Sequence, residues 1–438
     1  MRDYLVLAII FGSLPICIIR PYIGILVWSW ISYMNPHRLT WGPAFFFPVA
    51  KYVGLATLLG FIFTSEQKKL PLVRETILIF LLWTVFTVSS ILAFYPDKAW
   101  DHWNQTSKIL LMTIITTCLI TDRARLRNLL LTIAFSIGFY GLKGGIFGLL
   151  TGGEFRVWGP PYTFIEDNNA LALALLVVAP ITFYLAREEK NWKLKLALRI
   201  TFFLSILSII LSYSRGALLG LIAITAMFLI KIRKISLVIG ILIGACLLFA
   251  FIPEQWFERM STIKTYEQDA SAMGRINAWY FAWNIARERP FFGGGFGVFD
   301  PRLFIIYAPE PYNFHDAHSI YFEMLGEQGF TGLVLFLTLL TSSFLSTRKL
   351  KKTVKHIPSL EWIGNYSDML ELSLYAYIVS GAFLGLAYFD LSYHIISLVI
   401  ILKALAKKEL KLLADKEKRI QAGKEMSRQV SGVSTQAL

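Results

Sequence analysis

Long apolar runs alternate with short polar segments over most of this chain. A helix that crosses a bilayer needs about 20 mostly apolar residues. The pattern predicts an all-α polytopic membrane protein with about 12–13 transmembrane helices and one long, partly helical loop at 253–317. The first two runs meet at Arg20-Pro21 and form either a tight hairpin or one broken span. The candidate spans are 4–19, 22–34, 43–63, 76–94, 108–120, 128–150, 169–186, 196–212, 216–230, 235–252, 318–346, 369–388 and 391–406.

Basic residues collect on one side of these spans. When the spans are counted alternately, well over half of the 43 Lys and Arg residues fall on the same side. Short loops rich in Lys and Arg stay in the cytoplasm, so we expect that side to be cytoplasmic and the long loop to be periplasmic. The first run lacks a basic start and a small-residue cleavage site, so we expect no cleavable signal peptide. The basic segments are 64–75, 121–127, 187–199, 231–234, 347–368 and the tail from 403.

Composition agrees with this topology. Of 438 residues, 55% are hydrophobic and 16% charged, which excludes a disordered protein and argues against a soluble multidomain enzyme. The net charge of +14 reflects the basic loops, while the long loop is nearly neutral, so we expect no nucleic-acid partner. Cys17, Cys118 and Cys246 lie in apolar runs without ligand spacing and are expected to be buried packing residues.

Two arginines stand out on the predicted periplasmic side. Tyr213-Ser214-Arg215-Gly216 joins two spans with almost no loop, so Arg215 lies at the membrane edge. Its side chain either reaches toward lipid headgroups or forms a fixed fork for a phosphate or pyrophosphate. Arg275 stands at the start of a helical pattern that runs from Ile276 to Arg289, where free backbone N–H groups also favour anions.

A histidine-rich segment precedes the span that begins at 318. His318 is a candidate general base, because a neutral imidazole takes a proton from a hydroxyl near neutral pH. Tyr321 shares its helical face. A metal site on His315, Asp316 and His318 and a satisfied interfacial histidine are the alternatives. The glycine-rich segment 293–297 lacks the setting of a nucleotide fingerprint, and a flexible loop is the simpler interpretation.

Other polar residues could complete a site on this side. Arg156 lies in the loop 151–168. Asp167 and Asn168 lead into a span, where a helix cap is the simpler role. Lys143 lies within a span and either reaches an anion in a cavity or extends to the interface. One turn apart in the last hairpin, Asp390 and His394 could form a proton pair.

An ordered set of short motifs resembles the O-antigen ligase and polymerase superfamily. The set covers Ser214 to Leu345, and each motif alone is degenerate. The N-terminal region resembles a narrower branch, the exosortase-associated putative O-glycosylation ligases of Gram-negative bacteria. The motifs are Ser214-Arg215-Gly216, Gly274-Arg275 with Trp279, Pro290, Gly293 to Gly297, His318-Ser319 with Tyr321, Leu325, Glu327, Gly329 and Gly332, and, in the N-terminal region, Arg20 to Gly24, Tyr33 to Arg38 and Asp167 to Ala170.

The resemblance implies a glycosyltransferase of the bacterial inner membrane. It would move a glycan from undecaprenyl pyrophosphate to an acceptor hydroxyl of a lipid, protein or glycan at the periplasmic face, without metal or other cofactor. Arg215 and Arg275 would hold the pyrophosphate, and His318 would activate the acceptor. Lys143, Arg156, Asp167, Asn168, His315 and Tyr321 are possible supporting residues, and the expected partners are the lipid-linked donor, the acceptor and membrane lipids.

The resemblance also divides the chain. Residues 1–195 would form the N-terminal transmembrane region of the O-glycosylation ligase branch, and 196–406 the O-antigen ligase-like core with the periplasmic loop. Residues 407–438 would form a basic, disordered cytoplasmic tail. A polymerase of the same architecture differs from a ligase only in its acceptor. A transporter or flippase is a further alternative, although it would carry ionisable residues throughout its span interiors.

Overall fold

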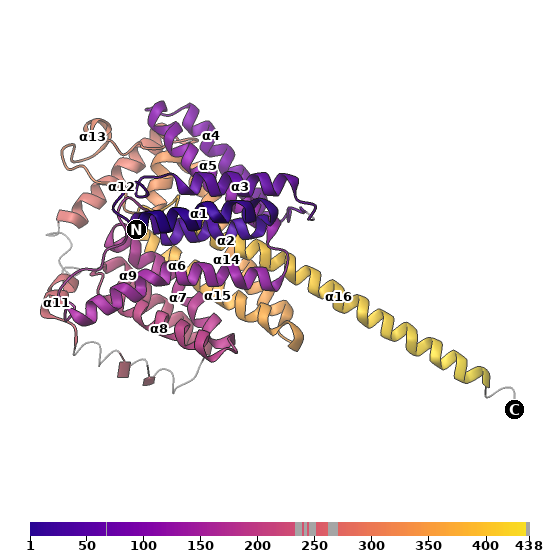
Figure 1. Ribbon diagram of the computed structural model, residues 1–438. Coiled ribbons are helices and arrows are strands. Elements are labelled where there is room, and N and C mark those ends of the chain that lie inside the picture. Colours follow the sequence, from indigo (N-terminus) through magenta and orange to yellow (C-terminus); the bar gives the residue numbers. More distant parts are fainter. Residues whose placement is uncertain (67, 233–238, 241–242, 245–250, 262–269, 435–438) are drawn as a thin grey trace.

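The described part of the chain is a bundle of helices without a β-strand (Figure 1). A computed structural model describes residues 1–438 except 67, 233–238, 241–242, 245–250, 262–269 and 435–438, and describes the backbone alone at 232 and 423–434. The expected all-α architecture is therefore confirmed. The helices that correspond to predicted spans are α1 (Arg2–Ile19), α2 (Pro21–Met34), α3 (Val49–Phe63), α4 (Arg74–Ile91), α5 (Pro96–Leu119), α6 (Arg123–Leu150), α7 (Asn168–Glu188), α8 (Trp192–Ile210), α9 (Arg215–Ile232), α14 (Ile320–Val354), α15 (Glu361–Ser380) and α16 (Asp390–Ser434).

The bundle has two distinct ends. We call the end that carries α11 (Glu254–Ser261), α12 (Ala270–Glu288) and α13 (Pro301–Tyr307) the loop end, and the end from which α16 projects the tail end (Figure 1). At the tail end, Arg125 pairs with Glu66 at 2.6 Å, which joins two of the basic loops. The alternation predicted from the basic residues therefore corresponds to two opposite ends of the molecule.

The first two helices form a hairpin. The carboxylate of Asp3, at the start of α1, accepts hydrogen bonds from the backbone N–H groups of Gly42 (2.9 Å) and Ala44 (3.1 Å), which follow α2. The beginning of α1 and the end of α2 thus lie together at the loop end, and the chain reverses at Arg20-Pro21. Of the two alternatives, the tight hairpin is the one that forms.

Among the described helices, five are long and apolar enough to cross a membrane on their own: α1, α4, α6, α7 and α14. The shorter or more polar helices pack beside them in the same bundle (Figure 1). The candidate span 235–252, with Cys246, lies largely outside the described residues, whereas Cys17 and Cys118 are buried as expected. The number of 12 or 13 spans remains a prediction.

Several boundaries differ from those predicted. α5 begins at Pro96, twelve residues before its apolar run, and α15 covers Glu361–Ser380 where 369–388 was expected. In both helices, polar residues occupy the additional turns, so hydropathy alone misses them. α16 continues from the last span into the predicted tail as one helix to Ser434. The tail is rich in Lys, Glu, Leu and Ala, which favour helix in water.

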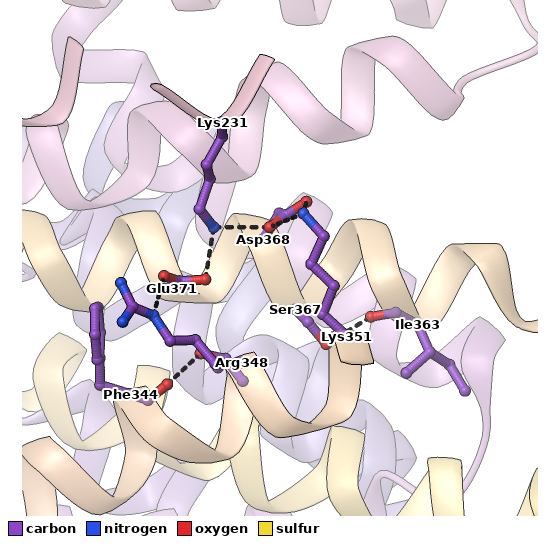
Figure 2. Close-up of polar contacts among 9 residues, drawn as sticks. Lys231, Phe344, Arg348, Lys351, Ile363, Ser367, Asp368 and Glu371 are labelled. Carbon is purple, nitrogen blue, oxygen red and sulfur yellow. Dashed lines mark hydrogen bonds and ion pairs between the residues drawn. The ribbon is translucent and has the colours of Figure 1, made fainter. Parts of the chain in front are cut away.

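Ion pairs join the helices at the tail end (Figure 2). The buried carboxylate of Glu371 accepts hydrogen bonds from Lys231 of α9 (2.5 Å) and Arg348 of α14 (2.8 Å). One turn earlier on α15, Asp368 accepts bonds from Lys231 (2.7 Å) and Lys351 (2.6 Å). Carboxylates on a span are costly unless paired, and these pairs explain how α15 carries two of them.

Helix α6 packs closely on α8 through a glycine face. A Cβ at Gly145 would lie 2.5 Å from the carbonyl oxygen of Leu204, and one at Gly141 would lie 2.1 Å from the Ser205 hydroxyl oxygen. Small residues allow membrane helices to approach in this way. Lys143 lies on α6 but is exposed. The packing therefore turns Lys143 away from the interior, whereas the ionisable residues Glu75, Glu327, Glu371, Asp390 and His394 are among those that are buried.

Candidate functional site

A cavity of about 50 Å³ lies at the loop end and is lined by four arginines. Two of them, Arg215 and Arg275, are the arginines that the sequence singles out, and Arg156 was a supporting candidate. We call this space the arginine cavity. Its described lining residues are Arg156, Asn168, Asn169, Tyr213, Ser214, Arg215, Gly216, Arg259, Arg275 and Phe383.

The turn between α8 and α9 fixes Arg215 at the cavity. The Ser214 hydroxyl oxygen accepts a hydrogen bond from the N–H of Ala217 (3.2 Å) and so caps α9, whose first residue is Arg215. The Asn168 side chain donates to the carbonyl oxygen of Ser212 at 2.6 Å, which ties this turn to the start of α7. Two helix N-termini, those of α7 and α9, therefore meet at the cavity and favour an anion there.

Arg275 reaches the cavity from within a helix. α12 begins at Ala270, so Arg275 lies in its second turn and not at the helix start that we expected. The free backbone N–H groups at the helix N-terminus therefore do not contribute to anion binding beside Arg275. Gly274 precedes it, and the His315 imidazole packs so closely on Gly274 that a Cβ there would be 2.3 Å from the ring. This contact joins α12 to the histidine-rich segment.

Arg259 is the arginine that sequence reasoning missed. It lies on α11, whose Trp256 is buried and donates from its indole N–H to the carbonyl oxygen of Ile210 at 2.9 Å. This bond docks α11 against the end of α8 and brings Arg259 to the arginine cavity. The sequence contains one local indication of this helix: a short polar segment with a tryptophan on one helical face follows the predicted span 235–252. That pattern does not indicate that Arg259 lies at the arginine cavity.

His318 lies close enough to Arg275, one of the cavity arginines, to feel its charge, and it has a constrained backbone position. Its φ of 41° lies in the left-handed region, and its side chain is half-buried. Burial lowers the pKa of the imidazole, and the positive charge of Arg275 lowers this pKa further, whereas Asp316 and Asp167 act in the opposite direction. The neutral form is thus favoured near pH 7, as general-base catalysis requires.

Side chains of α12 hold the segment that leads to His318. The Asn277 amide donates to the carbonyl oxygens of Glu310 and Asn313, both at 2.9 Å, and accepts from the N–H of Glu310. Trp279 donates from its indole N–H to the carbonyl oxygen of Ala317 at 2.8 Å. Asn277 carried no signal in the sequence, because an asparagine inside a helical pattern has many common roles.

The remaining supporting candidates have structural partners or lie elsewhere. Asp167 caps α7 by accepting from the N–H of Asn169 at 2.8 Å, as the simpler interpretation held. Tyr321 donates its hydroxyl to the carbonyl oxygen of Ile378 at 2.8 Å. Lys143 is exposed and is not among the described residues that line the arginine cavity.

The proposed proton pair does not form as expected. Asp390 begins α16, and His394 instead forms a 2.6 Å hydrogen bond with the Tyr33 hydroxyl of α2. Both side chains are buried between helices. This bond joins the N-terminal hairpin to the last span.

The glycine-rich segment 293–297 is held against α14 by backbone hydrogen bonds. The N–H groups of Gly294 and Gly295 donate to the carbonyl oxygens of Gly326 and Glu327, both at 2.9 Å. α14 is kinked at Gly329, and a Cβ on that residue would lie 2.7 Å from the backbone nitrogen of Gly293. The glycines permit backbone contact between the turn and the kink. The flexible-loop interpretation is therefore wrong.

The alternative metal site is not assembled. Among the residues whose placement is described, no group of three or more His, Cys, Asp or Glu side chains could hold a metal ion. His315 instead packs on Gly274, and Asp316 is exposed. His315, Asp316 and His318 therefore do not converge as ligands. Independence of the reaction from metal remains a prediction.

Two protein families match parts of the chain, 1–190 and 200–337. Residues 200–337 match the O-antigen ligase family, and residues 1–190 match a family of unknown function (DUF5935). No curated protein matches the chain. The arginine cavity draws Arg215, Arg259 and Arg275 from the first range and Arg156 from the second. The exosortase-associated branch remains a prediction. This multi-pass membrane protein therefore carries an O-antigen ligase domain at residues 200–337.

Proposed function

We propose that this protein transfers a glycan from a polyprenyl pyrophosphate carrier to an acceptor hydroxyl. The observation that carries the proposal is the arginine cavity, where four guanidinium groups and two helix N-termini meet at one end of a membrane bundle. Such a site matches a pyrophosphate, because arginine binds phosphate oxygens with two parallel hydrogen bonds and keeps its charge. A lipid carrier explains why an enzyme acting on sugars lies in the membrane.

The reaction separates charge in a way that the site can stabilise. The acceptor oxygen attacks the anomeric carbon of the donor sugar, and His318 takes the hydroxyl proton. The bond between that carbon and the pyrophosphate oxygen breaks, and the polyprenyl pyrophosphate leaves with the electron pair. Arg215 and Arg275 stabilise the negative charge that develops on the leaving group. Electrostatic stabilisation of this kind is usually the largest single contribution to catalysis.

The two regions expected from the sequence divide the work in this proposal. The N-terminal region, 1–195, contributes Arg156 and Asn168, and the core, 196–406, contributes the other arginines and His318. A polymerase would use the same donor site and pass the glycan to another lipid-linked chain. Mass spectrometry of the product made from a lipid-linked glycan and candidate acceptors distinguishes these two outcomes. Inhibition by EDTA that a divalent ion reverses would contradict a metal-independent reaction.

The substitutions Arg215→Ala, Arg275→Ala and His318→Ala test the mechanism. Each is expected to lower transfer by the purified protein by a factor of about 100 or more while the protein stays in the membrane. Arg287→Ala is the matched control, since Arg287 is an exposed residue of the same helix α12. Full activity in any of the three variants would remove that residue from the mechanism.

We further propose that the loop end faces the periplasm of a bacterial inner membrane. The proposal is supported by the basic residues at the opposite, tail end. A cysteine in place of the exposed Tyr312, at the loop end, should react with an impermeant thiol reagent in intact cells. A cysteine in place of the exposed Lys355, at the tail end, should be protected. The reverse pattern would invert the orientation.

A further inference from the structure

A second hollow adjoins the arginine cavity. Its volume is about 370 Å³, and it is more open to the outside. Arg156, Tyr213 and Arg259 line both spaces, so the two are continuous through these side chains. The other described lining residues are Glu154, Gln255 and Glu258. We call this space the carboxylate hollow.

The two spaces differ in size. The arginine cavity, at about 50 Å³, has room for only a few water-sized groups. It suits phosphate groups but is too small to enclose a sugar ring as well. The carboxylate hollow, at about 370 Å³, falls in the usual range of small-ligand sites. A sugar attached to a pyrophosphate in the first space would enter the second.

The two spaces also differ in chemistry. The described lining of the arginine cavity contains four arginines and no carboxylate, whereas in the carboxylate hollow Glu154 and Glu258 balance the charges of Arg156 and Arg259. Carboxylates repel a pyrophosphate, but they accept strong hydrogen bonds from hydroxyl groups. Gln255 offers both a donor and an acceptor. The lining therefore favours a neutral ligand with many hydroxyl groups.

Tyr213 forms a rigid wall between the two spaces. Its hydroxyl donates to the carbonyl oxygen of Gly153 at 2.8 Å, and the Arg156 guanidinium lies 6.0 Å from the centre of its ring. The backbone of Tyr213 has a φ of 59°, a left-handed position held by the turn before α9. The ring is 7% exposed and packs with Ile252 and Trp256, which holds it in place between the two spaces.

From these observations we propose that the carboxylate hollow binds the first sugar of the donor, the one bonded to the pyrophosphate. Glu154, Glu258 and Gln255 bind its hydroxyl groups, and Tyr213 separates it from the arginine cavity. The inference rests on the proposed function, because it requires the pyrophosphate to lie in the arginine cavity. It assigns recognition of the sugar and recognition of the phosphates to different side chains.

Binding of two lipids by the purified protein tests this division. One is undecaprenyl pyrophosphate, and the other is undecaprenyl pyrophosphate that carries a single N-acetylglucosamine. We expect the protein to bind the sugar-bearing lipid about tenfold more tightly. The variant with both Glu154→Gln and Glu258→Gln should lose most of this preference and keep its affinity for the sugar-free lipid within about twofold. Glu288→Gln, at the same end of the bundle but outside the described lining of both spaces, should behave like the unchanged protein.

The possible failures are distinguishable. An unchanged protein without preference, or a double variant that keeps the preference, would overturn the sugar site. A double variant that weakens the binding of both lipids equally would mean that the carboxylates orient the arginines, and it would also overturn the proposal. If Arg215→Ala binds the sugar-free lipid as tightly as the unchanged protein, the pyrophosphate site itself is wrong, and with it the proposed function.

Discussion

Gly274 and His315 are in contact in a way that only glycine permits: a Cβ at position 274 would lie 2.3 Å from both Nδ1 and Cε1 of the imidazole. Gly274 precedes Arg275 on α12, and His315 lies three residues before His318. The contact therefore sets the distance between the helix that carries an arginine of the cavity and the segment that carries the candidate base.

Gly274→Ala should impair both transfer and stability. The added methyl group must push His315 away, which shifts the segment that ends at His318. A displacement of about 1 Å at a reacting group lowers rates by a factor of about 100. We expect kcat for transfer to fall by about 10- to 100-fold, with a loss of stability of about 1–3 kcal/mol, measured by thermal unfolding in detergent.

Gly12→Ala is the matched control for this substitution. A Cβ at Gly12 on α1 would meet nothing within 4 Å, so both kcat and stability should stay unchanged. Full activity of Gly274→Ala would show that the contact does not position His318.

Asn277→Ala should lower kcat without changing the KM for the donor. The substitution removes three hydrogen bonds that hold Glu310 and Asn313, and with them the segment before His318. The arginine cavity remains, so donor binding should persist. We expect kcat to fall by about tenfold or more, since a lost buried hydrogen bond costs about 1–3 kcal/mol.

Asn284→Ala provides the comparison. Asn284 also lies on α12, and its side chain donates to the carbonyl oxygen of Tyr307 at 2.8 Å, which holds α13 instead. A similar loss of kcat in both variants would point to general damage to α12 and contradict a specific role of Asn277.

The pH dependence of transfer should report on His318. A protonated imidazole cannot take a proton, so activity is lost as pH falls through the His318 pKa. Burial and the Arg275 charge lower this pKa, so activity should persist below the ordinary value of about 6.5. The Asp316 carboxylate raises the pKa, so Asp316→Asn should move the acid limb of the kcat profile to lower pH.

Glu288→Gln is the control for this profile, because the Glu288 carboxylate bonds the Tyr307 hydroxyl on another part of the loop end. Its acid limb should stay in place. A shift of the limb to higher pH in Asp316→Asn, or no acid limb at all in the unchanged protein, would contradict His318 as the base.

Glu371→Gln should destabilise the bundle while leaving the chemistry intact. The Glu371 carboxylate is 2% exposed and bonds both Lys231 and Arg348 at the tail end, far from the arginine cavity (Figure 2). A neutral amide offers one acceptor to two cations. We expect the free energy of unfolding to fall by about 1–3 kcal/mol, with kcat preserved at low temperature.

Glu361→Gln tests whether the loss is specific, since Glu361 is an exposed residue at the start of the same helix α15. It should unfold at the temperature of the unchanged protein. An equal loss in the two variants, or none in Glu371→Gln, would mean that the ion pairs contribute nothing.

The linear pattern of the chain is enough to predict the class of fold and the alternation of its two ends. Apolar runs about as long as a bilayer is thick can only be helices that cross it, because every backbone polar group must be satisfied within the helix. The positions of the basic loops distinguished the tail end of the bundle from the loop end. The same local information isolated Arg215, because two spans joined by almost no loop leave few positions for the side chain between them.

The residues that meet at the site come together through the packing of the helices. Arg259 and Arg156 join Arg215 and Arg275 because α11 docks through Trp256 and because α7 is tied to the turn before α9. The rotation of α6 on its glycine face turned Lys143 outward. Such outcomes depend on packing between segments far apart in the chain. A local sequence pattern contains no information about that packing. The four arginines therefore form one site only in the assembled bundle.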